Sequence, residues 1–312
     1  MARLDRPEGF TDIRYDGWLE RCLPAATHPY LRLARLDRPI GTWLLLFPCW
    51  WSLALASPGW PGGGWLWLAA LFAVGAVVMR GAGCTVNDIL DRDLDARVER
   101  TRGRPIPSGQ VTARQAAAFM VFQMLFGLAV LLQLTPTAVG LGVGSLVLVF
   151  TYPLMKRITW WPQAFLGLAF NWGALMGWAA VRDGLAEPAL VLYAAGIAWT
   201  LGYDTIYAHQ DKEDDARIGV KSTARWLGDN SRPWIFGFYA TTLAGIGLAG
   251  WLAGLNPLFW LGLALGGGQL LWQVRGWEMN DPADCLLRFK SNRWFGWLIL
   301  GAIVAGNLPR PG

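Results

Sequence analysis

Apolar residues fill nine long segments of the chain, separated by shorter connections that carry most of the charged side chains. A transmembrane helix needs about 17 to 25 consecutive, mostly apolar residues. The segments that reach or approach this length are 40–57, 64–83, 114–133, 136–155, 162–181, 187–207, 234–254, 257–275 and 293–308. The pattern therefore predicts an all-α, polytopic membrane protein with nine transmembrane helices.

The positive residues between these segments predict how the helices are oriented. Of the 27 Lys and Arg residues, 25 fall in the N-terminal segment and in every second connection, which leaves Arg182 and Arg310 for the other side. Lys and Arg accumulate in loops that stay in the cytoplasm. We therefore expect a multi-pass protein of a bacterial-type cell inner membrane, with its N-terminus in the cytoplasm and its C-terminus outside.

The amino-acid composition agrees with a polytopic membrane protein and gives no reason to expect a nucleic-acid-binding protein. The chain is 54% hydrophobic and 16% charged, and it contains 20 Trp and 38 Gly, as polytopic membrane proteins do. The net charge of +5 follows from the cytoplasmic loops and an anionic lipid surface, so no nucleic acid is expected as a partner.

Residues 1–30 lack the apolar core of a signal peptide. We expect them to form a cytoplasmic segment before a single transmembrane domain over 31–312.

One short stretch after the second apolar segment carries four carboxylates and an amide. Asn87, Asp91 and Asp95 stand at positions i, i+4 and i+8 of the expected helix, each rotated by about 40° from the last. Such a row of oxygens suits Mg²⁺, which prefers oxygen ligands and usually shares its shell with substrate phosphates. The alternative is a solvated acidic helix end, which is less apt beside an apolar run in a membrane protein.

A second acidic cluster ends the sixth apolar segment. Asp204, Asp211 and Asp215 stand at i, i+7 and i+11, and an uninterrupted helix would place them within about 40° of one face. Both clusters lie at the cytoplasmic end of an even-numbered segment, and this match is a stronger signal than either cluster alone. We expect the nine helices to surround a central cavity with the two Asp-rich motifs at its cytoplasmic side.

Cations accompany both clusters. Arg35 and Arg38 precede the first apolar segment, the arginines of residues 97–104 follow the first cluster, and Lys156 and Arg157 end the fourth segment. The 97–104 region and the Pro and Gly residues after it indicate an irregular loop, whose guanidinium groups can reach phosphate oxygens. Interfacial anchoring and the ordinary positive charge of cytoplasmic loops remain alternative explanations for these residues.

Two carboxylate faces with cations at their rim suit a diphosphate held by Mg²⁺, which neutralises the leaving group. If the diphosphate is esterified to an allylic isoprenoid, its departure leaves a carbocation that an apolar interior shelters from water. Residue types alone do not select the isoprenoid. A transporter also uses intramembrane carboxylates, but alternating access needs a site near the membrane midplane, and a structural scaffold would need neither cluster.

The two motifs resemble those of the UbiA family of intramembrane prenyltransferases. The matching patterns are Asn87-Asp88-x-x-Asp91-x-x-x-Asp95 and Tyr203-Asp204-Thr205-x-Tyr207-Ala208-x-x-Asp211-x-x-Asp214-Asp215. Residues 35–43 and 152–157 are similar to the branch of the family that acts on 4-hydroxybenzoate. The resemblance covers residues 30–308 and implies transfer of a polyprenyl group from polyprenyl diphosphate to the ring carbon ortho to the hydroxyl of 4-hydroxybenzoate, an early step of ubiquinone synthesis. Naphthoate, homogentisate and haem remain alternative acceptors.

The resemblance also implies roles for individual residues. The expected Mg²⁺ ligands are Asn87, Asp91, Asp95, Asp211 and Asp215. The expected catalytic residues are Asp91, Asp204 and Asp211. The expected substrate-binding residues are Arg35, Arg38, Arg102, Arg104, Lys156, Arg157 and Tyr207, of which Arg35 and Arg38 are the nearest cations left for the carboxylate of the aromatic acid. Membrane lipid is the expected surrounding partner.

Overall fold

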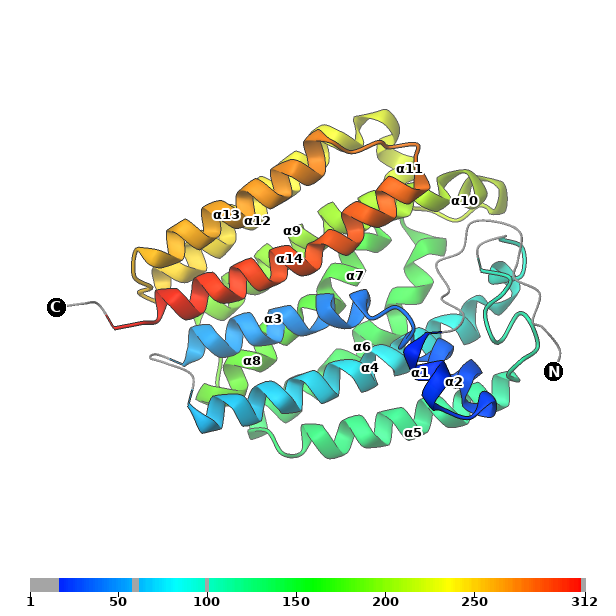
Figure 1. Cartoon of the computed structure of the whole chain (residues 1–312), viewed down its shortest axis with the longest axis horizontal. Coiled ribbons are helices and arrows are strands. Elements are labelled where there is room, and N and C mark those ends of the chain that lie inside the picture. Colours follow the sequence, from blue (N-terminus) through cyan, green and yellow to red (C-terminus); the bar gives the residue numbers. More distant parts are fainter. Residues whose placement is uncertain (1–16, 58–61, 99–100, 310–312) are drawn as a thin grey trace. The chain divides into compact units, whose positions relative to one another are not determined.

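A computed structural model of the chain describes residues 17–57, 62–98 and 101–309, in which every regular element is a helix (Figure 1). The longer helices are α3 (Ile40–Ala56), α4 (Gly63–Asp95), α5 (Ala113–Leu131), α6 (Pro136–Ile158), α7 (Pro162–Asn171), α8 (Gly173–Arg182), α9 (Glu187–Ala208), α12 (Ser231–Leu252), α13 (Leu258–Arg275) and α14 (Pro282–Gly306). The shorter ones are α1 (Trp18–Cys22), α2 (His28–Leu33), α10 (Lys212–Ile218) and α11 (Thr223–Leu227), with 3₁₀ turns η1 (Ala25–Thr27), η2 (His209–Asp211) and η3 (Gly228–Asn230).

Six helical stretches of the described chain are long and apolar enough to cross a membrane. They are Gly63–Asp95, Ala113–Leu131, Pro136–Ile158, Pro162–Arg182, Glu187–Ile218 and Thr223–Leu252. Helices occupy the other three predicted segments as well, but α3 has only 17 residues, and the first half of α14 carries Asp284, Arg288, Lys290 and Arg293. A multi-pass, all-helical membrane architecture is therefore found within the described residues, whereas the count of nine spans is not confirmed.

The chain forms two compact units. Unit 1 consists of Met1–Gly41 and Val77–Leu128, and unit 2 consists of Thr42–Ala76 and Ala129–Gly312. The first acidic motif belongs to unit 1 and the second to unit 2. The long helix α4 belongs to unit 2 at its start and to unit 1 at its acidic end.

A small apolar core stabilises unit 1 around its acidic helix end. Leu33 of α2, Val111 of the connection after α4 and Ala116 of α5 are buried together, and Tyr30 packs its ring edge against Phe119 at 5.2 Å between centroids. Ile106 and Val111 of the connection after α4 contribute to this core, which positions this part of the connection in spite of its Pro and Gly content. From this connection, Arg104 reaches the carboxylates of Asp88 and Asp95.

Unit 2 is built around α9, which packs against α7, α12 and α14 (Figure 1). In its interior the rings of Trp51, Trp199 and Phe295 are fully buried and in mutual contact. The indole N–H of Trp199 donates a 2.8 Å hydrogen bond to Oδ1 of Asn292. Polar bonds between buried helices are expected in a membrane interior, where water is absent.

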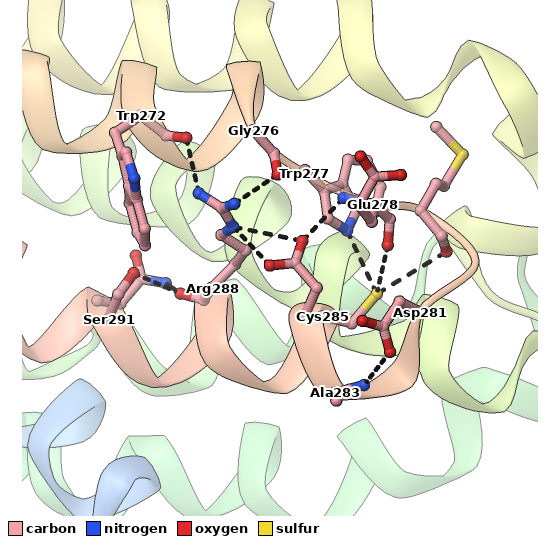
Figure 2. A network of polar contacts seen from close by, with 12 residues as sticks. Trp272, Gly276, Trp277, Glu278, Asp281, Ala283, Cys285, Arg288 and Ser291 are labelled. Carbon is pink, nitrogen blue, oxygen red and sulfur yellow. Dashed lines mark hydrogen bonds and ion pairs between the residues drawn. The ribbon is translucent and has the colours of Figure 1, made fainter.

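The corner between α13 and α14 is fixed by Arg288 (Figure 2). Its guanidinium donates to the backbone carbonyls of Trp272 and Gly276, pairs with Asp284 at 3.1 Å, and lies 4.0 Å from the centre of the Trp272 ring. The last carbonyls of a helix have no partner within the helix, and a cation stabilises them. Arg288 of α14 therefore caps the C-terminal end of α13.

Candidate functional site

The first acidic motif lies in an uninterrupted part of α4. The helix continues through Asp95, so the expected i, i+4, i+8 relation of Asn87, Asp91 and Asp95 holds locally. Asp91 is fully buried and Asp95 is 7% exposed, whereas Asn87 is partly exposed. Carboxylates that have left water require cations or hydrogen-bond donors around them.

Arginines supply such partners from two neighbouring segments. Arg104 donates from Nη1 to Oδ2 of Asp95 at 2.7 Å and to Oδ1 of Asp88 at 3.2 Å. Arg35 donates from Nη2 to both oxygens of Asp88, at 2.6 and 2.8 Å. Arg35 and Arg104, predicted as substrate-binding residues, therefore lie directly beside the first acidic motif.

The backbone of Arg35 adopts a left-handed conformation with a φ of 57°. Such a φ is uncommon outside glycine and is maintained only by surrounding contacts. Here Nη1 of Arg35 donates to the carbonyl oxygen of Arg32 at 2.8 Å, and Arg32 in turn pairs with Glu20 of α1 at 2.8 Å. The segment before α3 is therefore linked by ion pairs to α1, through Arg32 and Glu20, and to α4, through Arg35 and Asp88.

The remaining predicted cations of unit 1 differ in their surroundings. Arg38 is partly buried, and its Nε lies 3.6 Å from Oδ2 of Asp37. Arg102 is exposed, and Arg100 lies outside the described residues. On α4 the exposed pair Arg92 and Asp93 lies 3.5 Å apart.

The second acidic motif is not one continuous helix. Helix α9 ends at Ala208, the 3₁₀ turn η2 covers His209–Asp211, and α10 then begins at Lys212. A 3₁₀ turn advances by about 120° per residue instead of 100°. The expectation of one uninterrupted helix over Asp204, Asp211 and Asp215 was therefore wrong, so helix spacing alone does not fix the relative directions of these partly exposed side chains.

A hydrogen-bonded chain positions the aromatic part of the second motif. Nδ2 of the buried Asn171 donates to the hydroxyl of Thr200 at 2.8 Å, and that hydroxyl donates to the phenol oxygen of Tyr203 at 3.0 Å. One turn later, the centre of the Tyr207 ring lies 4.3 Å from the centre of the Phe289 ring. Asn171 thus contributes to the support of this motif as well as to helix contact.

The segment after α10 returns to the end of α6. The backbone N–H of Lys221 donates to the carbonyl oxygen of Lys156 at 2.9 Å, and the hydroxyls of Thr205 and Thr223 lie 2.7 Å apart. The backbone of Lys156 is therefore hydrogen-bonded to the segment that follows the second motif within unit 2. Arg157 is exposed.

The donor sets of both motifs fit a hard divalent cation, because they consist of carboxylate and amide oxygens. Within the described residues, three or more His, Cys, Asp or Glu side chains are nowhere grouped closely enough to hold a metal ion. Mg²⁺ usually takes only one or two carboxylates from a protein and completes its shell with water and phosphate oxygens. Asp91 and Asp95 stand about one turn apart on α4, and Asp211 and Asp215 stand four residues apart where η2 meets α10.

Sequence reasoning assigned no role to Asp88, the carboxylate that contacts both arginines. Asp88, Asp91 and Asp95 stand at i, i+3 and i+7, which also places them on one helix face. This spacing was available in the sequence. The pairing partner was not, because Arg35 lies 53 residues away.

Comparison with known proteins gives consistent matches. The chain matches the UbiA prenyltransferase family over residues 45–299. It is 50% identical over 299 residues to "4-hydroxybenzoate polyprenyltransferase, mitochondrial" of Arabidopsis thaliana, covering 95% of this chain and 72% of that protein. With the human protein of the same name it is 48% identical over 292 residues, covering 91% and 77%.

Solved structures show the same fold at lower identity. The apo structure of a UbiA homolog from Aeropyrum pernix K1 superposes with a TM-score of 0.71 at 24% identity, covering 84% of this chain and 96% of that chain. A UbiA homolog from Archaeoglobus fulgidus bound to GPP and Mg²⁺ gives a TM-score of 0.64 at 17% identity, covering 88% and 99%.

Proposed function

Since this chain belongs to the UbiA prenyltransferase family, we propose that it prenylates 4-hydroxybenzoate. The reaction transfers a polyprenyl group from polyprenyl diphosphate to the ring carbon ortho to the hydroxyl, giving 3-polyprenyl-4-hydroxybenzoate for ubiquinone biosynthesis. The observation that carries this proposal is the 50% identity, over 95% of the chain, to a protein named for that activity.

The chain is a multi-pass membrane protein. We propose that it has nine spans, with residues 1–30 in the cytoplasm, a single domain over 31–312 and the C-terminus outside, on the evidence of the Lys and Arg distribution. The relatives are named as mitochondrial proteins and give no support to a bacterial-type inner membrane. That location rests on the sequence pattern alone.

Mg²⁺ is the proposed cofactor. The homologue from Archaeoglobus fulgidus, whose structures are described as bound to GPP or DMAPP with Mg²⁺, supports it, as do the oxygen donors of both motifs. The residues that would hold Mg²⁺ are Asn87, Asp91 and Asp95 in the first motif, and Asp211 and Asp215 in the second. When bound, it supplies the positive charge that stabilises a departing diphosphate.

The chain's own side chains have distinct proposed roles. Arg35 and Arg38 bind the carboxylate of 4-hydroxybenzoate, since a guanidinium matches carboxylate geometry and retains its charge when buried. The proposed diphosphate contacts are Arg102, Arg104, Lys156 and Arg157. Tyr207 is proposed to contact substrate. Asp204 is proposed to act with Asp91 and Asp211 in catalysis.

The test is prenyl transfer by membranes that contain the protein. They are incubated with ring-labelled 4-hydroxybenzoate, Mg²⁺ and prenyl diphosphates of several chain lengths, and lipid-soluble label is measured. We expect product only when the diphosphate and Mg²⁺ are both present. Parallel incubations with a naphthoate and homogentisate test the acceptor, and labelling of either one in place of 4-hydroxybenzoate would contradict the assignment.

A further inference from the structure

The Asp88 carboxylate, like that of Asp91, is fully enclosed within unit 1. It is 0% exposed, and both of its oxygens accept hydrogen bonds. Oδ1 receives Nη2 of Arg35 at 2.6 Å and Nη1 of Arg104 at 3.2 Å, while Oδ2 receives Nη2 of Arg35 at 2.8 Å. One carboxylate therefore fixes two guanidinium groups that come from different segments of the chain.

Stability alone does not account for this arrangement. Taking a carboxylate and two guanidinium groups out of water is costly, and well-packed apolar residues often replace a buried ion pair without loss of stability. Arg35 also has its left-handed backbone, which tends to occur where function requires a fixed geometry. Arg35 thus combines two energetically unfavourable features, a buried charge and a left-handed backbone.

We propose that Asp88 is a positioning residue, a buried anion that orients Arg35 toward the aromatic carboxylate and Arg104 toward the diphosphate, and that it does not bind the metal. This inference rests on the proposed function. A metal ion on Asp88 would have to displace an arginine, which would leave a guanidinium buried without its counter-ion. Asp95 meets Arg104 through Oδ2 at 2.7 Å, whereas Arg35 engages both oxygens of Asp88. Asp91 and Asp95 therefore keep their proposed role as metal ligands, and Asp88 keeps the neighbouring cations in register with the substrates.

The first experiment compares wild-type protein with Asp88→Asn, which keeps the shape of the side chain and removes its charge. We expect the KM for 4-hydroxybenzoate and the KM for the diphosphate each to rise about tenfold or more, because both arginines lose a charge-assisted contact. The Mg²⁺ concentration for half-maximal rate should stay within about twofold of the wild-type value, and kcat should change less than either KM. Asp93→Asn on the same helix is the matched control, since Asp93 is exposed.

A binding measurement separates this inference from the proposed function. Thermal unfolding of the purified protein is followed while inorganic pyrophosphate is titrated at saturating Mg²⁺. Asp88→Asn should need about tenfold more pyrophosphate than the wild type for the same rise in Tm. This result does not depend on the acceptor, so a wild-type protein that fails to prenylate 4-hydroxybenzoate would refute the proposed function and leave the Asp88 test intact.

A double variant covers the case in which Asp88→Asn does not fold. Asp88→Asn with Arg35→Gln removes both charges of the closest pair, so Arg35 is no longer buried without its counter-ion. If Asp88 acts through Arg35, the KM of this variant for 4-hydroxybenzoate should equal that of Arg35→Gln alone.

Three results would overturn the proposal. The first is additive losses in the double variant. The second is a rise in the half-saturating Mg²⁺ concentration of Asp88→Asn, which would make Asp88 a metal ligand. The third is wild-type KM values and pyrophosphate binding in a folded Asp88→Asn, which would make its role structural only.

Discussion

At the residue scale, Asp91 gives the clearest test of the proposed metal ligands, because its side chain is fully buried in the uninterrupted part of α4. Asp91→Asn should lower kcat/KM on the order of 10³-fold or more, since departure of the diphosphate depends on charge neutralisation in the transition state. Asp211→Asn should do the same. Asp93→Asn, whose side chain is 82% exposed, should retain the wild-type rate.

The combination of the two variants tests whether both motifs act on one diphosphate. When two residues act together in one step, the rate losses of their single variants do not add. The double variant Asp91→Asn with Asp211→Asn should therefore be scarcely slower than either single variant. Purified, folded protein is assayed over a Mg²⁺ titration. Independent, multiplicative losses would mean that the motifs serve different substrates, and an unchanged rate in EDTA would exclude a Mg²⁺ requirement.

At the element scale, α8 approaches α3 closely at two glycines spaced i, i+4. A Cβ on Gly177 would lie 2.4 Å from the backbone oxygen of Cys49 and 3.0 Å from the backbone nitrogen of Leu53, and one on Gly173 would lie 2.3 Å from the Cys49 sulfur. Small residues at this spacing are common where membrane helices pack tightly. The contact with backbone atoms cannot be relieved by a side-chain rotation.

Gly177→Ala should therefore destabilise the protein by about 1 to 3 kcal/mol, the usual effect of overpacking. Thermal unfolding in detergent measures the effect. Gly140→Ala in α6 is the control, because nothing lies within 4 Å of its added Cβ, and alanine favours a helix over glycine by about 0.5 to 1 kcal/mol. Equal Tm values for the two variants would contradict the close approach of α8 to α3.

The start of α6 is held by Asp183, the residue after α8. The backbone N–H of Thr137 donates to Oδ1 of Asp183 at 3.0 Å, and this bond, followed by that of the Thr137 hydroxyl, lowers the pKa of the Asp183 carboxyl. A carboxylate at a helix N-terminus is stabilised by the unpaired N–H groups there. The ionised form is therefore favoured in the folded protein.

The sign of the pH dependence follows from this lowered pKa. The stabilisation is complete above the unfolded pKa of an aspartate, about 3.9, and is lost as pH falls through the lower pKa of the folded state. Asp183→Asn keeps a side-chain acceptor and tolerates the residue's φ of 47°. Below about pH 4, the Tm of the wild type should fall more steeply than that of Asp183→Asn, and parallel curves would exclude this contribution.

At the scale of the whole molecule, the distribution of Lys and Arg makes the orientation testable. In a background in which the exposed Cys22 is replaced by Ser, single cysteines are placed at Gly184, Ser108 and Asn230. A membrane-impermeant thiol reagent should label position 184 in intact cells or vesicles of native orientation. Positions 108 and 230 should react only after permeabilisation, and labelling of position 108 from outside would refute the proposed orientation.

The sequence by itself determined the features that depend on local periodicity and on the membrane as solvent. Long apolar segments become helices because backbone polar groups must be satisfied internally in lipid, and the spacing of Asn87, Asp91 and Asp95 follows from the 3.6-residue turn within α4. The motifs also identified the family, which the comparison confirmed. These features need no knowledge of which segments meet.

Only the tertiary structure decided the partners of these residues. Arg35 and Asp88 are 53 positions apart, and no periodicity relates them, so their pairing arises from the packing of α2, α4 and the connection between α4 and α5. The same holds for the approach of Gly177 to Cys49. The turn at His209–Asp211 was missed because its residues are compatible with an α-helix, and tertiary contacts, such as the 2.9 Å hydrogen bond between His209 and Ser231, decide between two helical forms of similar energy.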